Sequence, residues 1–193
     1  VYNNINYNTN NNLNSNTTLY RTISNAGCFH GDSLVQISRN NYKKISDLKK
    51  NDRVLDTTGQ ESIIQCVIVF PCNETACLSE LPGGLKITPY HPIKINNIWK
   101  FPIDIVGAKN INCNKVYNFV LNTRRSIIVN NVECCTLAHN MVGNVIEHDF
   151  FGTDKIIDNL KMDFRQGWDL GYIDNITKII RSPNTNNIIR YEK

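Results

Sequence analysis

The bond between Gly27 and Cys28 has the residue types for attack of a side chain on its own backbone. A cysteine that directly follows a small residue can attack the preceding carbonyl through a five-membered ring, and glycine hinders that attack least. Only a thiolate attacks well, so a functional site must lower the pKa of the thiol or supply a base. A lone cysteine at a strand start is more commonly structural, so the pair needs a second group to become a candidate site.

Thr88 and His91 are the groups that could assist such a cysteine. They stand three residues apart in a turn-like segment interrupted by Pro89 and Pro92, so both side chains could point at one target. A hydroxyl can hold a peptide in a twisted geometry, and an imidazole can give a proton to a departing amide nitrogen. The alternative is a turn histidine that makes ordinary surface hydrogen bonds.

His139 and Asn140 form a further candidate site. An asparagine side chain can cyclise onto its own backbone carbonyl, which breaks the chain after it, and a neighbouring histidine could protonate the leaving nitrogen. In an Asn-rich chain this dipeptide also arises by chance. Both interpretations stay open from the residues alone.

Short β-strands must position these residues. Runs of β-branched and aromatic residues recur about every eight to twelve residues with turn residues between them, which predicts an all-β domain. The expected strands cover residues 34–37, 53–56, 62–70, 85–88, 93–95, 99–101, 116–121 and 126–129. Later in the chain, Thr153 and Asp154 predict the cap of a helix that Gly167 would end. Residues 174–193 are polar, and we expect an irregular tail with one or two weak strands.

Composition excludes several classes of function. The 193 residues suit one domain with appendages. The net charge is only +4 and the basic residues are scattered, so we expect no nucleic-acid partner. The sequence contains no run of about eighteen apolar residues, so we predict no membrane-spanning helix. The chain starts with Val1, so we expect it to begin inside a longer protein, with the Asn-rich residues 1–25 as a linker from an upstream segment.

The seven cysteines are an odd number, which leaves at least one thiol unpaired within the chain. Buried thiols in a reducing compartment are the favoured interpretation, so an intracellular location is slightly favoured, and no cofactor or metal is expected. A rival of another class is a zinc-binding or disulfide-stapled interaction module. Its ligands or bridges would come from five residues: Cys72, Cys77, Cys134, Cys135 and His139.

Four segments in this order resemble the Hint superfamily, which comprises inteins, hedgehog autoprocessing domains and related self-cleaving modules. Residues 27–35 resemble its first block, and residues 45–55 resemble the stretch that follows. Thr88-Pro89-Tyr90-His91 matches its T-x-x-H block, and Val116-Tyr117-Asn118-Phe119 matches its late block. Several segments are similar to the Vint type in particular, found after von Willebrand factor A modules: residues 88–93, 99–102, 131–139 and 148–153, with Leu160, Gly167 and Trp168.

The resemblance implies a pseudo-twofold horseshoe of β-strands with a small C-terminal helical extension. It divides the chain into an autoprocessing domain over residues 26–140 and an extension over residues 141–193 with one helix and an irregular tail. It also implies self-cleavage by an N–S acyl shift at Gly27–Cys28, with Thr88 and His91 as helpers and His139 and Asn140 as candidates for a second break. The upstream partner would be a domain of the same polypeptide, of the von Willebrand factor A type. Water or a small nucleophile would then open the thioester.

Two positions depart from the pattern of splicing inteins. Met141 follows Asn140, where splicing needs Cys, Ser or Thr to take over the acyl chain, so ligation of the flanks is not expected. Asn118 stands where many inteins have an ionisable Asp, and an amide can orient a group but cannot supply an acidic proton. A further alternative is an inactive, structural Hint domain, against which the presence of Cys28, Thr88 and His91 argues.

Overall fold

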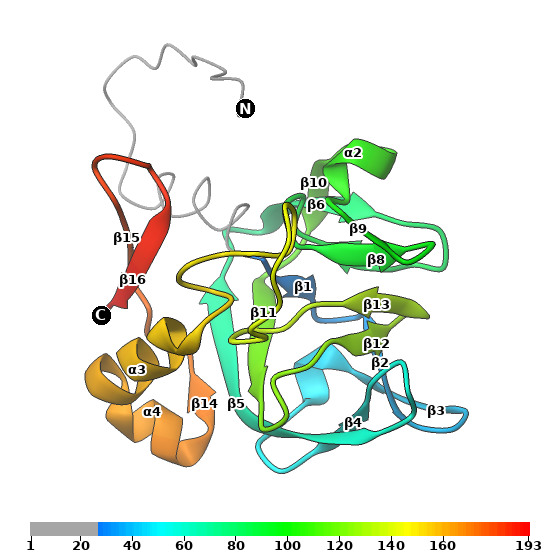
Figure 1. Ribbon diagram of the computed structural model, residues 1–193, viewed down its shortest axis with the longest axis horizontal. Coiled ribbons are helices and arrows are strands. Elements are labelled where there is room, and N and C mark those ends of the chain that lie inside the picture. Colours follow the sequence, from blue (N-terminus) through cyan, green and yellow to red (C-terminus); the bar gives the residue numbers. More distant parts are fainter. Residues whose placement is uncertain (1–26) are drawn as a thin grey trace.

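A computed structural model describes residues 27–193 of the chain (Figure 1). The predicted linker over residues 1–25 lies outside the described residues. Two sheets dominate the described part. The larger has the strand order β10-β6-β7-β1-β11-β5-β14, with β4 also paired to β5. Its members are β1 (Phe29–His30), β4 (Arg53–Leu55), β5 (Glu61–Pro71), β6 (Thr75–Glu80), β7 (Lys86–Ile87), β10 (Lys109–Asn112), β11 (Lys115–Leu121) and β14 (Tyr172–Ile173).

The second sheet has the order β3-β2-β12-β13-β8-β9. Its members are β2 (Leu34–Ser38), β3 (Asn41–Lys44), β8 (Ile93–Ile95), β9 (Ile98–Lys100), β12 (Ile127–Val129) and β13 (Val132–Cys134). Two short turns of helix, η1 (Ile45–Asp47) and α2 (Ile103–Val106), lie in the connections. All pairings in both sheets are antiparallel except that of β14 with β5.

The antiparallel pair β5–β11 divides the interior into two cores, because successive residues of a strand point to opposite faces. On β5, Cys66, Ile68 and Phe70 face one core, whereas Val67 and Val69 face the other. This explains why residues 66–70 form a continuous apolar run, while residues 61–65 of the same strand alternate between exposed and buried.

The C-terminal extension contains two helices rather than the single helix predicted. The predicted cap is present, since Thr153 Oγ1 accepts a hydrogen bond from the N–H of Lys155 at the start of α3 (Asp154–Asp163). Gly167 does not end this helix but lies inside the next one, α4 (Arg165–Leu170), which ends at Gly171 in a left-handed conformation. A Cβ on Gly167 would stand 2.8 Å from the carbonyl oxygen of Tyr172, so this glycine permits close packing of α4 on β14.

The polar tail, for which one or two weak strands were predicted in an irregular segment, contains two strands that pair as a hairpin. β15 (Lys178–Arg181) pairs with β16 (Ile188–Glu192), and Tyr191 of β16 is buried against the rings of Phe70 and Phe150 at centroid distances of 5.4 and 5.6 Å. The extension and the strands therefore share one core, which also contains Cys28. The predicted all-β class with a small C-terminal helical extension is confirmed.

Among residues 27–193, no helix is long and apolar enough to cross a membrane.

The amide of Asn159 attaches the tail hairpin to α3. Its Nδ2 donates to the carbonyl oxygen of Tyr191 at 3.1 Å, and its Oδ1 accepts from the N–H of the same residue at 2.8 Å. Asn159→Ala leaves both backbone groups without their partner, so we expect it to lower the free energy of unfolding by about 1–3 kcal/mol. Urea denaturation measures this change. The exposed neighbour Asp158→Ala is the control and should change stability by less than about 0.5 kcal/mol.

Candidate functional site

The register of β1 brings Cys28 between two strands that are distant in sequence. Phe29 lies opposite Ile87 of β7 on one side and opposite Tyr117 of β11 on the other. In antiparallel pairing, the residue before Phe29 then faces the residues after Ile87 and Tyr117, which are Thr88 and Asn118. The sheet thus delivers a hydroxyl and an amide to the two sides of the Gly27–Cys28 peptide.

Both polar atoms of that peptide are hydrogen-bonded by side chains. The N–H of Cys28 donates to Thr88 Oγ1 at 2.7 Å, and the carbonyl oxygen of Gly27 accepts from Asn118 Nδ2. The Oδ1 of the same Asn118 accepts from the N–H of Phe119 at 2.7 Å, which fixes the orientation of the amide. Thr88 is fixed as well, because its N–H donates to the carbonyl oxygen of Cys28 at 2.8 Å.

Gly27 has φ +59°, a left-handed backbone that side chains disfavour. An added Cβ would meet ordinary contacts, the nearest being His91 Nδ1 at 3.6 Å. Glycine is therefore favoured at this position by its backbone conformation rather than by space. The same distance indicates that the imidazole of His91 lies beside the candidate bond.

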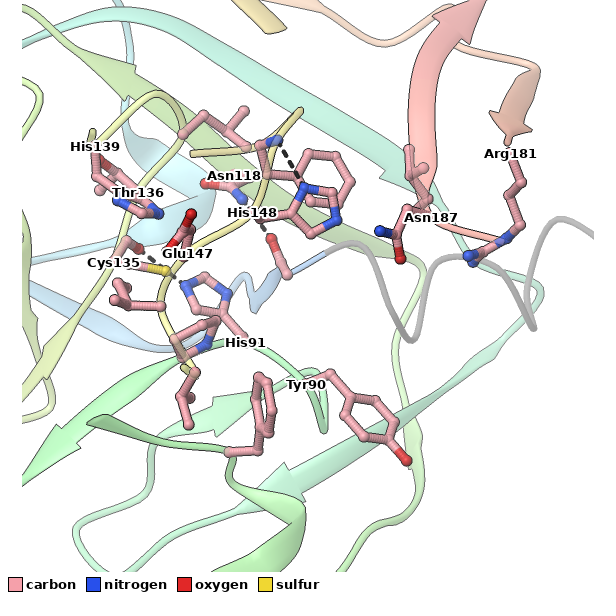
Figure 2. Close-up of a pocket in the computed structure, with 18 of the residues that line it drawn as sticks. Tyr90, His91, Asn118, Cys135, Thr136, His139, Glu147, His148, Arg181 and Asn187 are labelled. Carbon is pink, nitrogen blue, oxygen red and sulfur yellow. Dashed lines mark hydrogen bonds between the residues drawn. The ribbon is translucent and has the colours of Figure 1, made fainter. Parts of the chain in front are cut away.

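His91 is fully buried, and one ring nitrogen fixes its tautomer. Its Nε2 lies 2.9 Å from the carbonyl oxygen of Cys135 (Figure 2). A carbonyl can only accept, so Nε2 carries the hydrogen and Nδ1 is the unprotonated nitrogen of the neutral ring. That Nδ1 has no hydrogen-bond partner within residues 27–193. Burial, together with the nearby His139, lowers the pKa of His91 to about 4, so the ring is neutral at pH 7.

The Cys28 thiol is also fully buried. Burial, and secondarily the charge of Cys113, raises its pKa far above that of an ordinary thiol. At neutral pH the side chain is therefore the thiol, and it can act as a nucleophile only if a base removes its proton as it attacks.

A cavity of about 520 Å³ opens beside the candidate bond (Figure 2). Gly27, His91 and Asn118 line it together with His139 and His148. The Nδ1 of His139 accepts from the N–H of Met141 at 3.0 Å, so its Nε2 carries the hydrogen. Burial lowers the pKa of both His139 and His148, and the charged side chains of Glu147 and Arg181 also line the cavity.

The structure brings together four of the predicted catalytic residues with Gly27, namely Cys28, Thr88, His91 and His139. Asn140 is not among the residues that line the cavity. It is exposed, and in the orientation that satisfies its side-chain amide, the nitrogen donates to the carbonyl oxygen of Gly152 at 3.1 Å and the oxygen accepts from Arg124 at 3.2 Å.

The cysteines proposed for the rival zinc-binding or disulfide-stapled module form neither a metal site nor a disulfide within residues 27–193. Within residues 27–193, no group of three or more His, Cys, Asp or Glu side chains is arranged to hold a metal ion. Cys72, Cys77, Cys134 and Cys135 form no disulfide. Cys134, the last residue of β13, packs in the core that contains Phe29, whereas Cys135, which follows the strand, lines the cavity.

Two groups of the site were missed by sequence reasoning. One is the amide of Asn118 as a donor to the Gly27 carbonyl, and the other is the Cys135 carbonyl that fixes the tautomer of His91. The strand containing Asn118 was predicted, but its pairing with β1 depends on register, which no local pattern specifies. A backbone carbonyl leaves no signal in the residue types at all.

A comparison with known protein families identifies the family to which the chain belongs. The chain matches the family described as Vint: Hint-domain over residues 27–190. The protein therefore belongs to the Vint family of Hint domains, as the sequence resemblance predicted. The match includes the helices and the tail hairpin, so the extension is part of the family's pattern.

Solved structures similar to this chain include inteins. A DnaB intein from Synechocystis sp. PCC 6803 has 15% sequence identity and a TM-score of 0.45, covering 57% of this chain and 98% of its own. The gp41-1 intein has 13% identity and a TM-score of 0.40, with coverage of 57% and 98%. No curated protein matched this chain.

The tautomer of His91 can be tested by NMR. We expect long-range nitrogen–proton correlations to identify a neutral ring protonated on Nε2 that does not titrate between pH 8 and about 5. His30, whose pKa is raised above the usual 6.5, should titrate at a higher pH than His91 in the same spectra. Because an unfolded chain protonates histidine near pH 6.5 and folded His91 only near pH 4, acidification through this window favours unfolding. A His91 ring that is protonated at pH 7 contradicts the assignment.

Proposed function

We propose that the chain cuts its own backbone at Gly27–Cys28 by an N–S acyl shift. The observation that carries the proposal is the pair of side-chain hydrogen bonds on this peptide, from Cys28 N to Thr88 and from Asn118 to the Gly27 oxygen. Backbone groups near a sheet are ordinarily paired with other backbone groups. Side-chain partners on both polar atoms of one peptide suit a bond whose charges change during a reaction.

The first step is the attack of Cys28 Sγ on the carbonyl carbon of Gly27. A carbon–sulfur bond forms, and the electron pair of the carbonyl moves to its oxygen. The thiol proton goes to His91 Nδ1, the buried nitrogen with no hydrogen-bond partner among the described residues. This transfer is required because burial raises the pKa of the thiol and keeps it protonated.

The negative oxygen of the tetrahedral intermediate is stabilised by Asn118 Nδ2, which already donates to this oxygen in the uncleaved chain. A positioned donor of this kind typically contributes about 3 kcal/mol to the transition state. Since Asn118 is oriented by its own bond to the N–H of Phe119, it needs no rearrangement when the charge develops.

The intermediate then collapses by breaking the bond between the Gly27 carbon and the Cys28 nitrogen. The buried His91 imidazolium is a strong acid, because the pKa of this ring is about 4, and it returns its proton to the departing nitrogen. Thr88 keeps the nitrogen in place through the 2.7 Å hydrogen bond. The products are a thioester between Gly27 and Cys28 and a free amine on Cys28, with no net gain or loss of protons.

Water or a small nucleophile opens the thioester from the cavity lined by Gly27 and His139. The Nε2–H of His139 is available as a donor to an incoming group, since its Nδ1 is occupied by Met141 N–H. With water as the nucleophile, the upstream segment leaves with a carboxylate at Gly27. The reaction is a single turnover that needs no external substrate or cofactor. We propose an upstream domain of the same polypeptide, of the von Willebrand factor A type, as the released part.

Splicing and cleavage after Asn140 are less well supported. Met141 offers no side-chain nucleophile to accept an acyl chain. The Asn140 side chain lies outside the cavity and its amide nitrogen can donate to Gly152, so cyclisation needs a conformational change. The inactive Hint domain is the remaining alternative, and it predicts an intact chain under all conditions.

Replacement of the nucleophile separates these possibilities. In a chain with an upstream tag, we expect Cys28→Ala to abolish release of the tag and the wild type to yield a fragment that ends at Gly27, because no other thiol forms the five-membered ring. Intact-mass spectrometry identifies both products. Cys77→Ser, at an exposed thiol on β6, is the control and should cleave like the wild type. Normal release from Cys28→Ala, or an intact wild type, would overturn the proposal.

Asn118 provides a separate test of the oxyanion step. We expect Asn118→Ala and Asn118→Asp to slow cleavage by about 10²- to 10³-fold each, because neither alanine nor a carboxylate donates to the developing charge. The half-time of tag release on a gel measures the effect. Asn110→Ala, at an exposed position of β10, should leave the half-time unchanged. If Asn118→Asp cleaves at the wild-type rate, Asn118 does not act as this donor.

A further inference from the structure

A second cluster of reactive groups lies where β5 ends and β11 begins, away from the cavity of Figure 2. It consists of Cys72, Cys113 and His30. The N–H of Cys72 donates to the carbonyl oxygen of Asn114 at 2.7 Å, and the N–H of Cys113 donates to that of Glu74 at 2.8 Å. Two neighbouring, antiparallel segments therefore hold the two cysteines side by side.

The Cys113 sulfur is the centre of this cluster. The side chains of Cys72 and His30 are near enough to this sulfur to lower its pKa, and the Nε2 of His30 also lies 3.3 Å from the carbonyl oxygen of Asn112. The Nδ1 of His30 accepts from the N–H of Asp32 at 3.0 Å, so Nε2 carries the hydrogen in the neutral ring. The Cys113 sulfur also lies 3.0 Å from the carbonyl oxygen of Lys115, to which its thiol form donates.

The proximity of Cys72 and His30 favours a thiolate on Cys113 and a thiol on Cys72. Hydrogen bonding by Cys72, followed by the influence of His30, lowers the pKa of Cys113. The same contact raises the pKa of Cys72, together with its burial. Around His30, Cys113 raises the imidazole pKa, while burial and the charge of Lys86 lower it. The Asp32 carboxylate lies 3.9 Å from His30 Nδ1.

Small reagents can reach Cys113 although it is only 7% exposed. It lines an open cavity of about 500 Å³ with His30, Glu74, Asn112 and Asn114. None of these residues lines the cavity beside Gly27. Access is therefore independent of the site proposed for self-cleavage.

We propose that Cys113 is a peroxide-reactive thiol and that Cys72 is its resolving partner. In the first step, the Cys113 thiolate attacks one oxygen of hydrogen peroxide. The oxygen–oxygen bond breaks, hydroxide leaves and takes up a proton to become water, and Cys113 becomes a sulfenic acid. In the second step, the Cys72 sulfur attacks the Cys113 sulfur, and the hydroxyl group leaves with the Cys72 proton as a second water. The two thiols are thereby oxidised to a disulfide, and peroxide is reduced to two waters.

The pair adjoins the proposed nucleophile without taking part in its reaction. Cys28 belongs to the same buried cluster as Cys113, and the charge of Cys113 is a secondary cause of the raised pKa of Cys28. Formation of the disulfide removes that charge. The oxidation itself does not depend on self-cleavage, and it can be measured in a chain that carries Cys28→Ala.

The test is peroxide treatment of the full chain, followed by non-reducing digestion and mass mapping. We expect a Cys72–Cys113 cross-link in the wild type and in Cys28→Ala. In Cys72→Ser we expect a sulfenic acid on Cys113 that dimedone traps. At pH 6, iodoacetamide should modify Cys113 roughly tenfold faster than the exposed Cys77, since an ordinary thiol is almost entirely protonated at that pH.

His30→Gln separates the imidazole from the packing around it. We expect this variant to fold and to reduce the rate of Cys113 alkylation at pH 6 at least about fivefold, while Cys77 is alkylated as before. Preferential oxidation of Cys77, or a cross-link from Cys113 to Cys28 instead of Cys72, would contradict the proposal. So would alkylation of Cys113 that rises only above pH 8. An intact wild-type chain that still forms the Cys72–Cys113 cross-link overturns self-cleavage alone.

Discussion

The pairing of the two-residue strand β1 with both β7 and β11 is the constraint on which the site depends. Thr88 is sixty residues from Cys28 in sequence, and Asn118 is ninety residues from it. The register nevertheless places both Thr88 and Asn118 directly opposite Cys28. A shift of one residue in either pairing would turn Thr88 or Asn118 to the other face of the sheet. The buried ring of Phe29 opposes such a shift, because it stacks on Phe119 and packs against His91.

Burial gives each titratable group of the site one protonation state at neutral pH. Burial disfavours charge, so His91 is neutral and Cys28 is a thiol. Neither group is charged before the reaction, and the fold therefore avoids the cost of an unpaired buried ion. The same burial makes His91 a poor resting base but a strong acid once protonated. The proposed step that most depends on His91 is accordingly the protonation of the departing nitrogen.

Much of this arrangement was predictable from the sequence, and the remainder has identifiable physical reasons. The β-branched residues of strands such as β5 predict these strands, and the spacing of Thr88 and His91 identifies them as a candidate pair. The donor role of Asn118 depends on register between distant strands. The tail was predicted to be irregular with one or two weak strands because its composition is polar, and the pairing of its two strands into a hairpin was not predicted. Its order comes from one buried ring, Tyr191, and from the two hydrogen bonds that Asn159 makes to that residue's backbone.

The left-handed backbone of Gly27 links the fold to the energetics proposed for the acyl shift. An amide is more stable than a thioester, so the shift needs a peptide that is destabilised before reaction or a product that is quickly consumed. The peptide is fixed from both sides, because its N–H donates to Thr88 and its carbonyl oxygen accepts from Asn118, and glycine adopts the left-handed conformation at φ +59° at low cost. Packing of the core around β1 stabilises its register, and the register in turn maintains this geometry. On this reasoning, the core holds the peptide in position for attack, and the cavity beside Gly27 admits the nucleophile that consumes the thioester and makes the break irreversible.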